Sequence, residues 1–84
     1  MPLSDFRSMD SAREKILMKE FGERLKKFRN DRNLSVRALA DLADMDYTNI
    51  SAIENGKSNP SITTVIFLAE ALKVDPAELV KGTF

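Results

Sequence analysis

The chain has 84 residues, of which 43% are hydrophobic and 31% charged, and its 13 Lys and Arg residues balance its 13 Asp and Glu residues. These values are typical of one small globular domain, and the scarcity of Gly, Pro and aromatic residues favours helices over strands. The sequence has no Cys and no His, which excludes disulfides and removes the usual zinc ligands and the commonest general base, so we expect no enzyme, no metal site and no cofactor.

The first pattern in the chain is a helix that starts with a cap at Ser11. Ser11 and Glu14 have the spacing of a capping box. One helix face then carries apolar residues three or four positions apart, namely Leu17, Phe21, Leu25 and Phe28. Ile16 and Met18 widen this face, and the polar run over residues 30–33 ends the pattern.

The extent of this first segment has two open points. Gly22 lies inside the apolar pattern and costs about 1 kcal/mol of helix propensity relative to Ala. The segment is therefore either one helix over residues 12–32 or two pieces that meet near Gly22. Residues 1–10 show no period, so we expect a flexible N-terminus there and a single domain over residues 11–84.

Two short helices joined by a tight polar turn are predicted over residues 35–56. Ser35 is a good cap for the first of them, and the turn over residues 44–46 ends in Asp46, which caps the second. The predicted inner residues of the pair are Ala38, Leu39, Leu42, Ala43, Ile50 and Ile53. Gly56 supplies the stop after the second helix.

The remaining residues predict two more helices. Pro60 and Ser61 open the first, whose predicted inner residues are Ile62, Val65, Ile66, Ala69 and Leu72. Asp75 caps a last short helix that has Pro76 at its first position and is completed by Ala77, Leu79 and Val80. Because no segment has the alternation of a strand, we predict an all-α fold with five helices.

The two helices within residues 35–56 have the pattern of a helix-turn-helix, in which the second helix enters the major groove of DNA. The outer face of that second helix, at about residues 46–54, carries four short or flat side chains: Tyr47, Thr48, Ser51 and Ala52. They fit a groove about 12 Å wide, and we predict base contacts from them. None has the bidentate code of Arg or Gln, so DNA shape and flanking contacts must add specificity.

The polar residues at both ends of this motif are predicted to contact phosphates. They are Ser35, Arg37, Asn55, Lys57, Ser58 and Asn59. The alternative for the loop over residues 55–59 is an ordinary helix connection that Gly56 allows. Arg29 and Glu54 each end an apolar helix face, and an ion pair between them would tie the first helix to the third.

The charges are unevenly distributed along the chain although they sum to zero. Residues 13–37 carry nine Lys and Arg against four acidic residues, and residues 38–84 carry three against seven. DNA binding needs a local positive surface rather than a positive total. The alternative is that the first helix has only a Lys-rich outer face in solvent.

Residues 21–80 resemble the phage-repressor-like helix-turn-helix family of the Cro/C1 or xenobiotic-response-element type. The matching segments are Phe-Gly-Glu-Arg-Leu-Lys-Lys-Phe-Arg (21–29), Leu-Ser (34–35), Leu-Ala (39–40), Ile-Ser-Ala-Ile-Glu-Asn-Gly-Lys (50–57), Asn-Pro-Ser (59–61) and Leu-Ala-Glu-Ala-Leu-Lys-Val (68–74). The resemblance implies a five-helix, lambda-repressor-like domain, here with an N-terminal helical extension, that usually binds double-stranded DNA as a dimer. It also supports the predicted base and phosphate contacts and the Arg29–Glu54 pair.

The sequence departs from the family pattern at several positions. Val36 stands where the family often has a Gln that clamps a phosphate, and Asp44 stands where the turn usually has Gly. Tyr47 and Ala52 replace the Arg, Gln or Lys that such helices usually carry. These departures affect the affinity for DNA and the preferred sequence rather than the fold.

The resemblance also implies pairing of two copies through a surface of the fourth and fifth helices. The candidates for this interface are Phe67, Leu79 and Phe84, and residues 11–20, with Ile16 and Met18, are a second candidate. A large exposed aromatic residue is a typical interface anchor.

The sequence therefore predicts a sequence-specific DNA-binding transcriptional regulator, a homodimeric repressor that inserts the helix at about 46–54 in the major groove. The alternative is an antitoxin-like or adaptor protein whose main partner is another protein. No apolar run approaches the roughly 20 residues that span a bilayer, and the first residues lack the pattern of a signal peptide. We accordingly expect a cytoplasmic protein without membrane contact.

Overall fold

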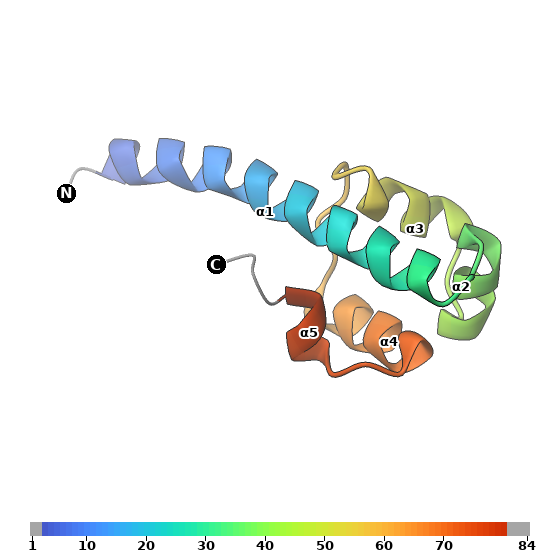
Figure 1. Cartoon of the computed structure of the whole chain (residues 1–84). Coiled ribbons are helices and arrows are strands. Elements are labelled where there is room, and N and C mark those ends of the chain that lie inside the picture. Colours follow the sequence, from blue (N-terminus) through green and yellow to red (C-terminus); the bar gives the residue numbers. More distant parts are fainter. Residues whose placement is uncertain (1–2, 81–84) are drawn as a thin grey trace.

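The computed structural model describes the backbone of residues 3–80 and the side chains of residues 11–80. It contains α1 (Leu3–Asp31), α2 (Val36–Ala43), α3 (Tyr47–Glu54), α4 (Ile62–Leu72) and α5 (Pro76–Val80). These five helices, without a strand in residues 3–80, confirm the predicted fold class. The four shorter helices gather around the C-terminal half of α1, and the N-terminal half of α1 extends beyond them (Figure 1).

The long helix α1 begins earlier than the sequence predicts. Its first residue is Leu3, so the expected cap at Ser11 is wrong. Neither Gly nor Pro occurs between Leu3 and Gly22, and nothing in the sequence stops the helix from starting there. The division into a flexible segment over residues 1–10 and a domain over 11–84 stays a prediction.

Gly22 does not interrupt α1, which is one continuous helix, and its lack of a side chain has a packing role instead. A Cβ atom at Gly22 would overlap the backbone oxygen of Ile53 and would lie 2.7 Å from that of Glu54. Gly22 therefore allows the backbone at the end of α3 to lie directly against α1.

The caps of α2 and α3 are formed as predicted. The side chains of Ser35 and Asp46 accept hydrogen bonds from backbone amides in the first turns of α2 and α3, at 3.0 and 3.2 Å. Asp44 ends α2 in the left-handed conformation with φ 54°, and Gly56, with φ 71°, follows α3. Short-range hydrogen bonds thus determine where both helices begin and end.

The same holds for the last two helices. Ser61 caps α4 through a hydrogen bond from the Thr64 amide at 3.2 Å, and Asp75 accepts one from Ala77 at 2.9 Å at the start of α5.

Leu79 of α5 is fully buried, and its side chain belongs to the core. The prediction that Leu79 lies in an interface between two copies is therefore wrong, because no part of it is accessible. Phe84 lies outside the described residues.

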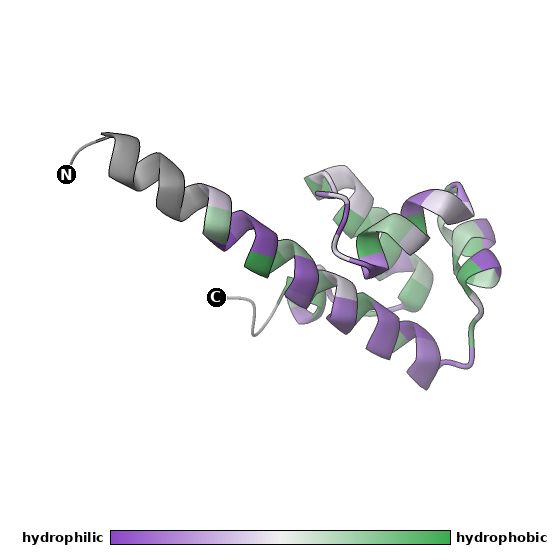
Figure 2. Cartoon of the chain, turned by 90° about the horizontal axis from the view of Figure 1, so that it is seen from above, coloured by the Kyte–Doolittle hydropathy of each residue, from purple (hydrophilic) through white to green (hydrophobic). Residues whose placement is uncertain are grey.

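The core lies between α1 and the four short helices. It consists of Phe21, Leu25, Leu39, Ala40, Ala43, Ile50, Ile53, Val65, Leu68, Ala69, Leu72 and Leu79. Seen from above, the outer side of the C-terminal half of α1 is largely hydrophilic (Figure 2), because its apolar residues turn toward the other helices.

Three predicted inner residues are exposed instead. Leu42 is 59% exposed, Ile62 73% and Ile66 40%, whereas Leu68, which was not predicted, is fully buried. The buried line of α4 runs through positions 65, 68, 69 and 72, and Ile66 lies about 100° around the helix from Val65. Ile62 is the first residue of α4, and α2 buries only positions 39, 40 and 43.

Candidate nucleic-acid interface

Helices α2 and α3 form a fixed unit with the turn between them. Met45 donates its backbone amide to the Ala40 oxygen at 2.9 Å, and Ala40 is buried where the two helices meet. Leu39 and Ile50, both fully buried, hold the inner faces of the two helices to the core. The angle of α3 is therefore set by packing and by the backbone of the turn.

The predicted base-contact residues share one side of α3. Tyr47 is 41% exposed and Thr48 is also exposed, while Ser51 and Ala52 are half-buried. The opposite side of α3 is buried through Ile50 and Ile53. The structure thus brings the four predicted side chains together on the surface of the second helix of the motif.

The predicted phosphate contacts lie at both ends of α3. Arg37 is exposed in the first turn of α2, beside the start of α3, and the Ser35 hydroxyl oxygen accepts the cap hydrogen bond from the Ala38 amide. After α3, three side chains of the loop are exposed and one is half-buried: Asn55, Lys57 and Asn59, and Ser58, respectively.

This loop is held in place by α1. The Lys57 amide donates to the Ala52 oxygen at 2.9 Å. A Cβ atom at Gly56 would lie 3.1 Å from the Cα of Lys19 in α1. The loop after α3 is thus packed against the long helix, which favours a defined position for its amides and side chains.

The Arg29–Glu54 ion pair is present as predicted. Arg29 donates from Nε to Oε2 of Glu54 at 2.6 Å and from Nη2 to Oε1 at 2.9 Å. Its Nη1 donates to the backbone oxygen of Leu34 at 2.7 Å and to Asn30 at 3.2 Å. The hydrogen bond with Glu54 raises the pKa of Arg29 above its ordinary value, so the guanidinium stays charged. Glu54 is thereby neutralised at the end of α3, where a free carboxylate would repel phosphate.

Sequence analysis missed three contacts that only the fold creates. The guanidinium of Arg37 lies over the ring of Tyr47, with Cζ 4.2 Å from the ring centroid. Arg32 donates from Nε to the backbone oxygen of Leu72 at 2.7 Å, which ties α1 to the end of α4. Gly22 makes the close approach to α3 described above. No sequence spacing reveals these contacts, because the partners belong to different segments that only the fold brings together.

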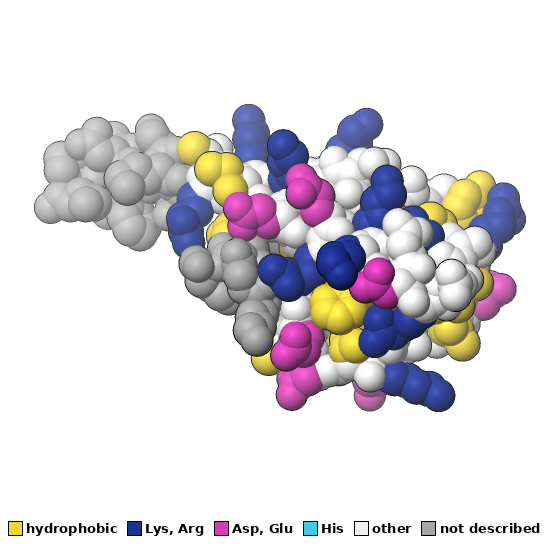
Figure 3. All heavy atoms as spheres, in the orientation of Figure 1, with side chains coloured by type: hydrophobic (Ala, Val, Ile, Leu, Met, Phe, Trp, Pro, Cys, Tyr) yellow, Lys and Arg dark blue, Asp and Glu magenta, His cyan; other side chains and the backbone are white. Residues whose placement is uncertain are grey.

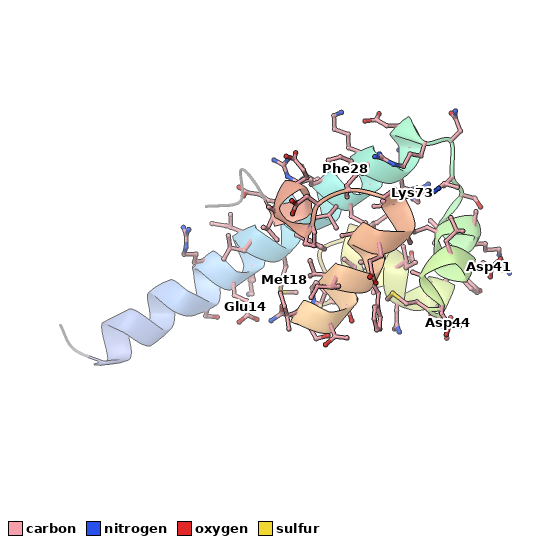
Figure 4. The ribbon with its side chains drawn as sticks, turned by 90° about the horizontal axis from the view of Figure 1, so that it is seen from below. Glu14, Met18, Phe28, Asp41, Asp44 and Lys73 are labelled. Carbon is pink, nitrogen blue, oxygen red and sulfur yellow. The ribbon has the colours of Figure 1, made fainter. Side chains whose placement is uncertain are left out.

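The charges on the surface are mixed. Figure 3 shows Lys and Arg side chains along the edge formed by α1 and α3, with Asp and Glu side chains among them on the same face. Asp41 and Asp44 lie at the outer edge of α2 (Figure 4). On the face drawn in Figure 3, positive and negative side chains are therefore interspersed and form no continuous basic surface.

Two hollows with partly apolar linings lie outside the predicted base-contact side of α3, and Asn59 of the loop after α3 lines one of them. One, between α2 and α4, has a volume of about 360 Å³ and is lined by Leu42, Ala43, Asp44, Phe67, Glu70 and Ala71. The other lies where Glu14 and Met18 of α1 approach α4 and α5 (Figure 4).

In residues 11–80 no group of three or more Asp, Glu, His or Cys side chains could hold a metal ion, and no described helix has the length and apolar character to cross a membrane.

Comparisons with known proteins agree with this geometry. The family model for the helix-turn-helix matches residues 25–79. The chain is 45% identical over 58 residues to the HTH-type transcriptional repressor RghR of Bacillus subtilis (strain 168), a match that covers 68% of this chain and 43% of RghR. It is 38% identical over 60 residues to the control protein C.MunI of Mycoplasma sp, covering 70% of this chain and 81% of C.MunI.

A solved structure has the same arrangement of helices. The restriction-modification controller protein C.AhdI from Aeromonas hydrophila matches with a TM-score of 0.73 at 35% identity, over 74% of this chain and 94% of that protein. This chain spans less than half of the length of RghR but most of C.MunI and C.AhdI. With the family model and these relatives covering the whole motif, the chain belongs to the Cro/C1-type helix-turn-helix DNA-binding family.

Proposed function

We propose that this chain is a DNA-binding transcriptional regulator that inserts α3 into the major groove. The observation that carries the proposal is the fixed α2–turn–α3 unit, which buries Ile50 and Ile53 and leaves Tyr47 and Thr48 exposed on the opposite side. A helix presented in this way fits the width of the major groove. The relatives RghR, named a transcriptional repressor, and C.AhdI, named a controller protein, support regulation, and RghR favours repression.

Phosphate contacts at the two ends of α3 hold it in register. Arg37 lies beside the start of the helix, and the loop with Asn55, Lys57 and Asn59 follows its end. Contacts of this kind orient a protein on DNA without reading its sequence. Because the side chains on α3 are short, sequence-dependent DNA shape supplies part of the specificity.

The regulator acts as a homodimer in this proposal, with Phe67 as the anchor of the interface. Phe67 is 48% exposed and lies beside Leu42 in the hollow between α2 and α4. A half-exposed aromatic residue next to a second exposed apolar residue favours burial against another protein surface. Two copies would place their α3 helices in half-sites about one helical turn of DNA apart. The proposed site of action is the cytoplasm, where bacterial DNA is located.

Selection of bound fragments from genomic DNA, followed by anisotropy titration at several salt concentrations, tests the proposal. We expect a preferred sequence and an affinity that falls steeply with salt. Ala52→Asp on α3 should abolish binding because it places a negative charge against the bases and phosphates. The matched control is Ala77→Asp on the exposed side of α5, which should bind like the wild type. Absence of salt-dependent binding to any fragment contradicts the proposal.

A second candidate function is an antitoxin-like or adaptor protein whose main partner is another protein. The hollow between α2 and α4 favours it, because Leu42 and Phe67 are exposed there beside the acidic Asp44 and Glu70. Co-expression with the product of the adjacent gene and size-exclusion chromatography of the complex tests this candidate. A stoichiometric complex that Phe67→Ser disrupts, formed by a chain that binds no DNA, would favour it over the regulator.

A further inference from the structure

The starts of α2 and α3 are linked by a cation–π pair. Arg37 is the second residue of α2 and Tyr47 is the first residue of α3. The Cζ atom of Arg37 lies 4.2 Å from the centroid of the Tyr47 ring, within the range of a cation–π contact. Both side chains are exposed, so the pair lies on the surface of the motif.

Among the side chains that the structure describes, Arg37 forms no ion pair with the acidic residues around it. Asp41, four positions later on α2, and Asp46 line the same hollow as the Arg37–Tyr47 pair. The ion pairs found in residues 11–80 are Lys27–Asp31 and Arg29–Glu54, and neither involves Arg37. A cation–π contact does not pair the N–H donors of the guanidinium with an acceptor, so these donors stay available for a phosphate.

The side chain of Val36, next to Arg37 in the first turn of α2, has no hydrogen-bond donor. Val36 is half-buried and packs against the core, and the Ser35 hydroxyl, whose oxygen accepts the cap hydrogen bond, has a single uncharged O–H donor. Arg37 is therefore the charged donor at the start of α2. Its guanidinium matches the two oxygens of a phosphate group.

We propose that Tyr47 is a positioning residue, whose ring holds the guanidinium of Arg37 toward a DNA phosphate, and that Tyr47 does not read a base. This inference rests on the proposed function and assigns one residue of its surface a different role. A long Arg side chain loses rotamer freedom when it binds, and the ring removes part of that freedom beforehand. The ring alone has this effect, and the phenol hydroxyl is not needed for it.

The test is a double-mutant cycle on the full chain with the DNA fragment that selection returns. Arg37→Ala should weaken binding about tenfold on every fragment and lower the magnitude of the salt slope by about 1. Tyr47→Ala should weaken binding about three- to tenfold, but less than twofold when Arg37 is already Ala, since a contact shared by two residues is lost only once. Tyr47→Phe should recover most of the affinity that Tyr47→Ala loses, and selection with either variant should return the same sequence.

Other outcomes overturn the inference. If Tyr47→Phe loses as much affinity as Tyr47→Ala, or if Tyr47→Ala changes the preferred base at one position, Tyr47 reads a base. Independent losses in the double variant exclude coupling between the two residues. A relaxed preference for one guanine in Arg37→Ala, with an unchanged salt slope, assigns Arg37 to a base. Absence of DNA binding by the wild type overturns the proposed function itself, which distinguishes that failure from these. Circular dichroism melting curves identify any variant that is unfolded at the temperature of the titration.

Discussion

Arg29 of α1 and Glu54, the last residue of α3, form a bidentate ion pair with donor–acceptor distances of 2.6 and 2.9 Å. Both side chains are almost fully buried. The pair therefore holds the second helix of the motif to the long helix, and it also keeps a carboxylate beside the candidate DNA surface from acting as a free negative charge.

Removing Arg29 should destabilise the domain strongly. Arg29→Ala leaves the Glu54 carboxylate buried without a partner, and we expect a loss of about 3–5 kcal/mol in the free energy of unfolding. Urea denaturation followed by circular dichroism measures it. The matched control is Lys27→Ala, which removes the exposed Lys27–Asp31 pair and should cost less than about 1 kcal/mol. Equal losses in the free energy of unfolding of the two variants would show that the buried pair stabilises the domain no more than the exposed pair does.

Gly22→Ala should destabilise the domain although Ala favours helices. In an exposed helix the change would gain about 1 kcal/mol. Here the added Cβ atom would overlap the Ile53 oxygen and force α1 and α3 apart, so we expect a net loss of about 1–3 kcal/mol in the free energy of unfolding. Thermal or urea unfolding is the measurement, and Glu23→Ala, at the next and exposed position of α1, should change stability by less than about 0.5 kcal/mol. A stabilised Gly22→Ala protein would contradict the close approach.

Lys73 ends α4 in the left-handed conformation with φ 58°, which is unfavourable for a residue with a long side chain. Lys73→Gly should remove this strain and raise the free energy of unfolding by about 1 kcal/mol. Lys26→Gly is the control: the same change at an exposed position inside α1 should lower it by about 1 kcal/mol. The two variants should thus shift the urea midpoint in opposite directions, and a shift in the same direction would contradict the role of the backbone at Lys73.

Phe67→Ser should weaken dimerisation. The side chain is 48% exposed in the hollow that it shares with Leu42, and loss of an aromatic anchor typically costs at least 2 kcal/mol of binding, or about thirtyfold in the dissociation constant. Sedimentation equilibrium measures that constant. Ile62→Ser, at an exposed apolar residue outside the hollow, is the control and should leave it unchanged. If Ile62→Ser also dissociates the dimer, the interface lies elsewhere on α4.

Local sequence signals specify where the helices after α1 begin, and the motif that these helices form identifies the family. Ser35, Asp46, Ser61 and Asp75 act on backbone amides two or three positions away, so the cap and its target are visible together in the sequence. Gly56 and Asp44 likewise mark left-handed positions that few residues adopt.

Packing between the helices decides which apolar side chains are covered. Leu42, Ile62 and Ile66 are as hydrophobic as Leu68, yet they stay exposed while Leu68 is fully buried. Burial depends on whether another helix lies above a given side, and the period of one helix carries no information on that. The overlap avoided at Gly22 and the cation–π contact of Arg37 with Tyr47 arise in the same way, since each needs two helices that packing brings together.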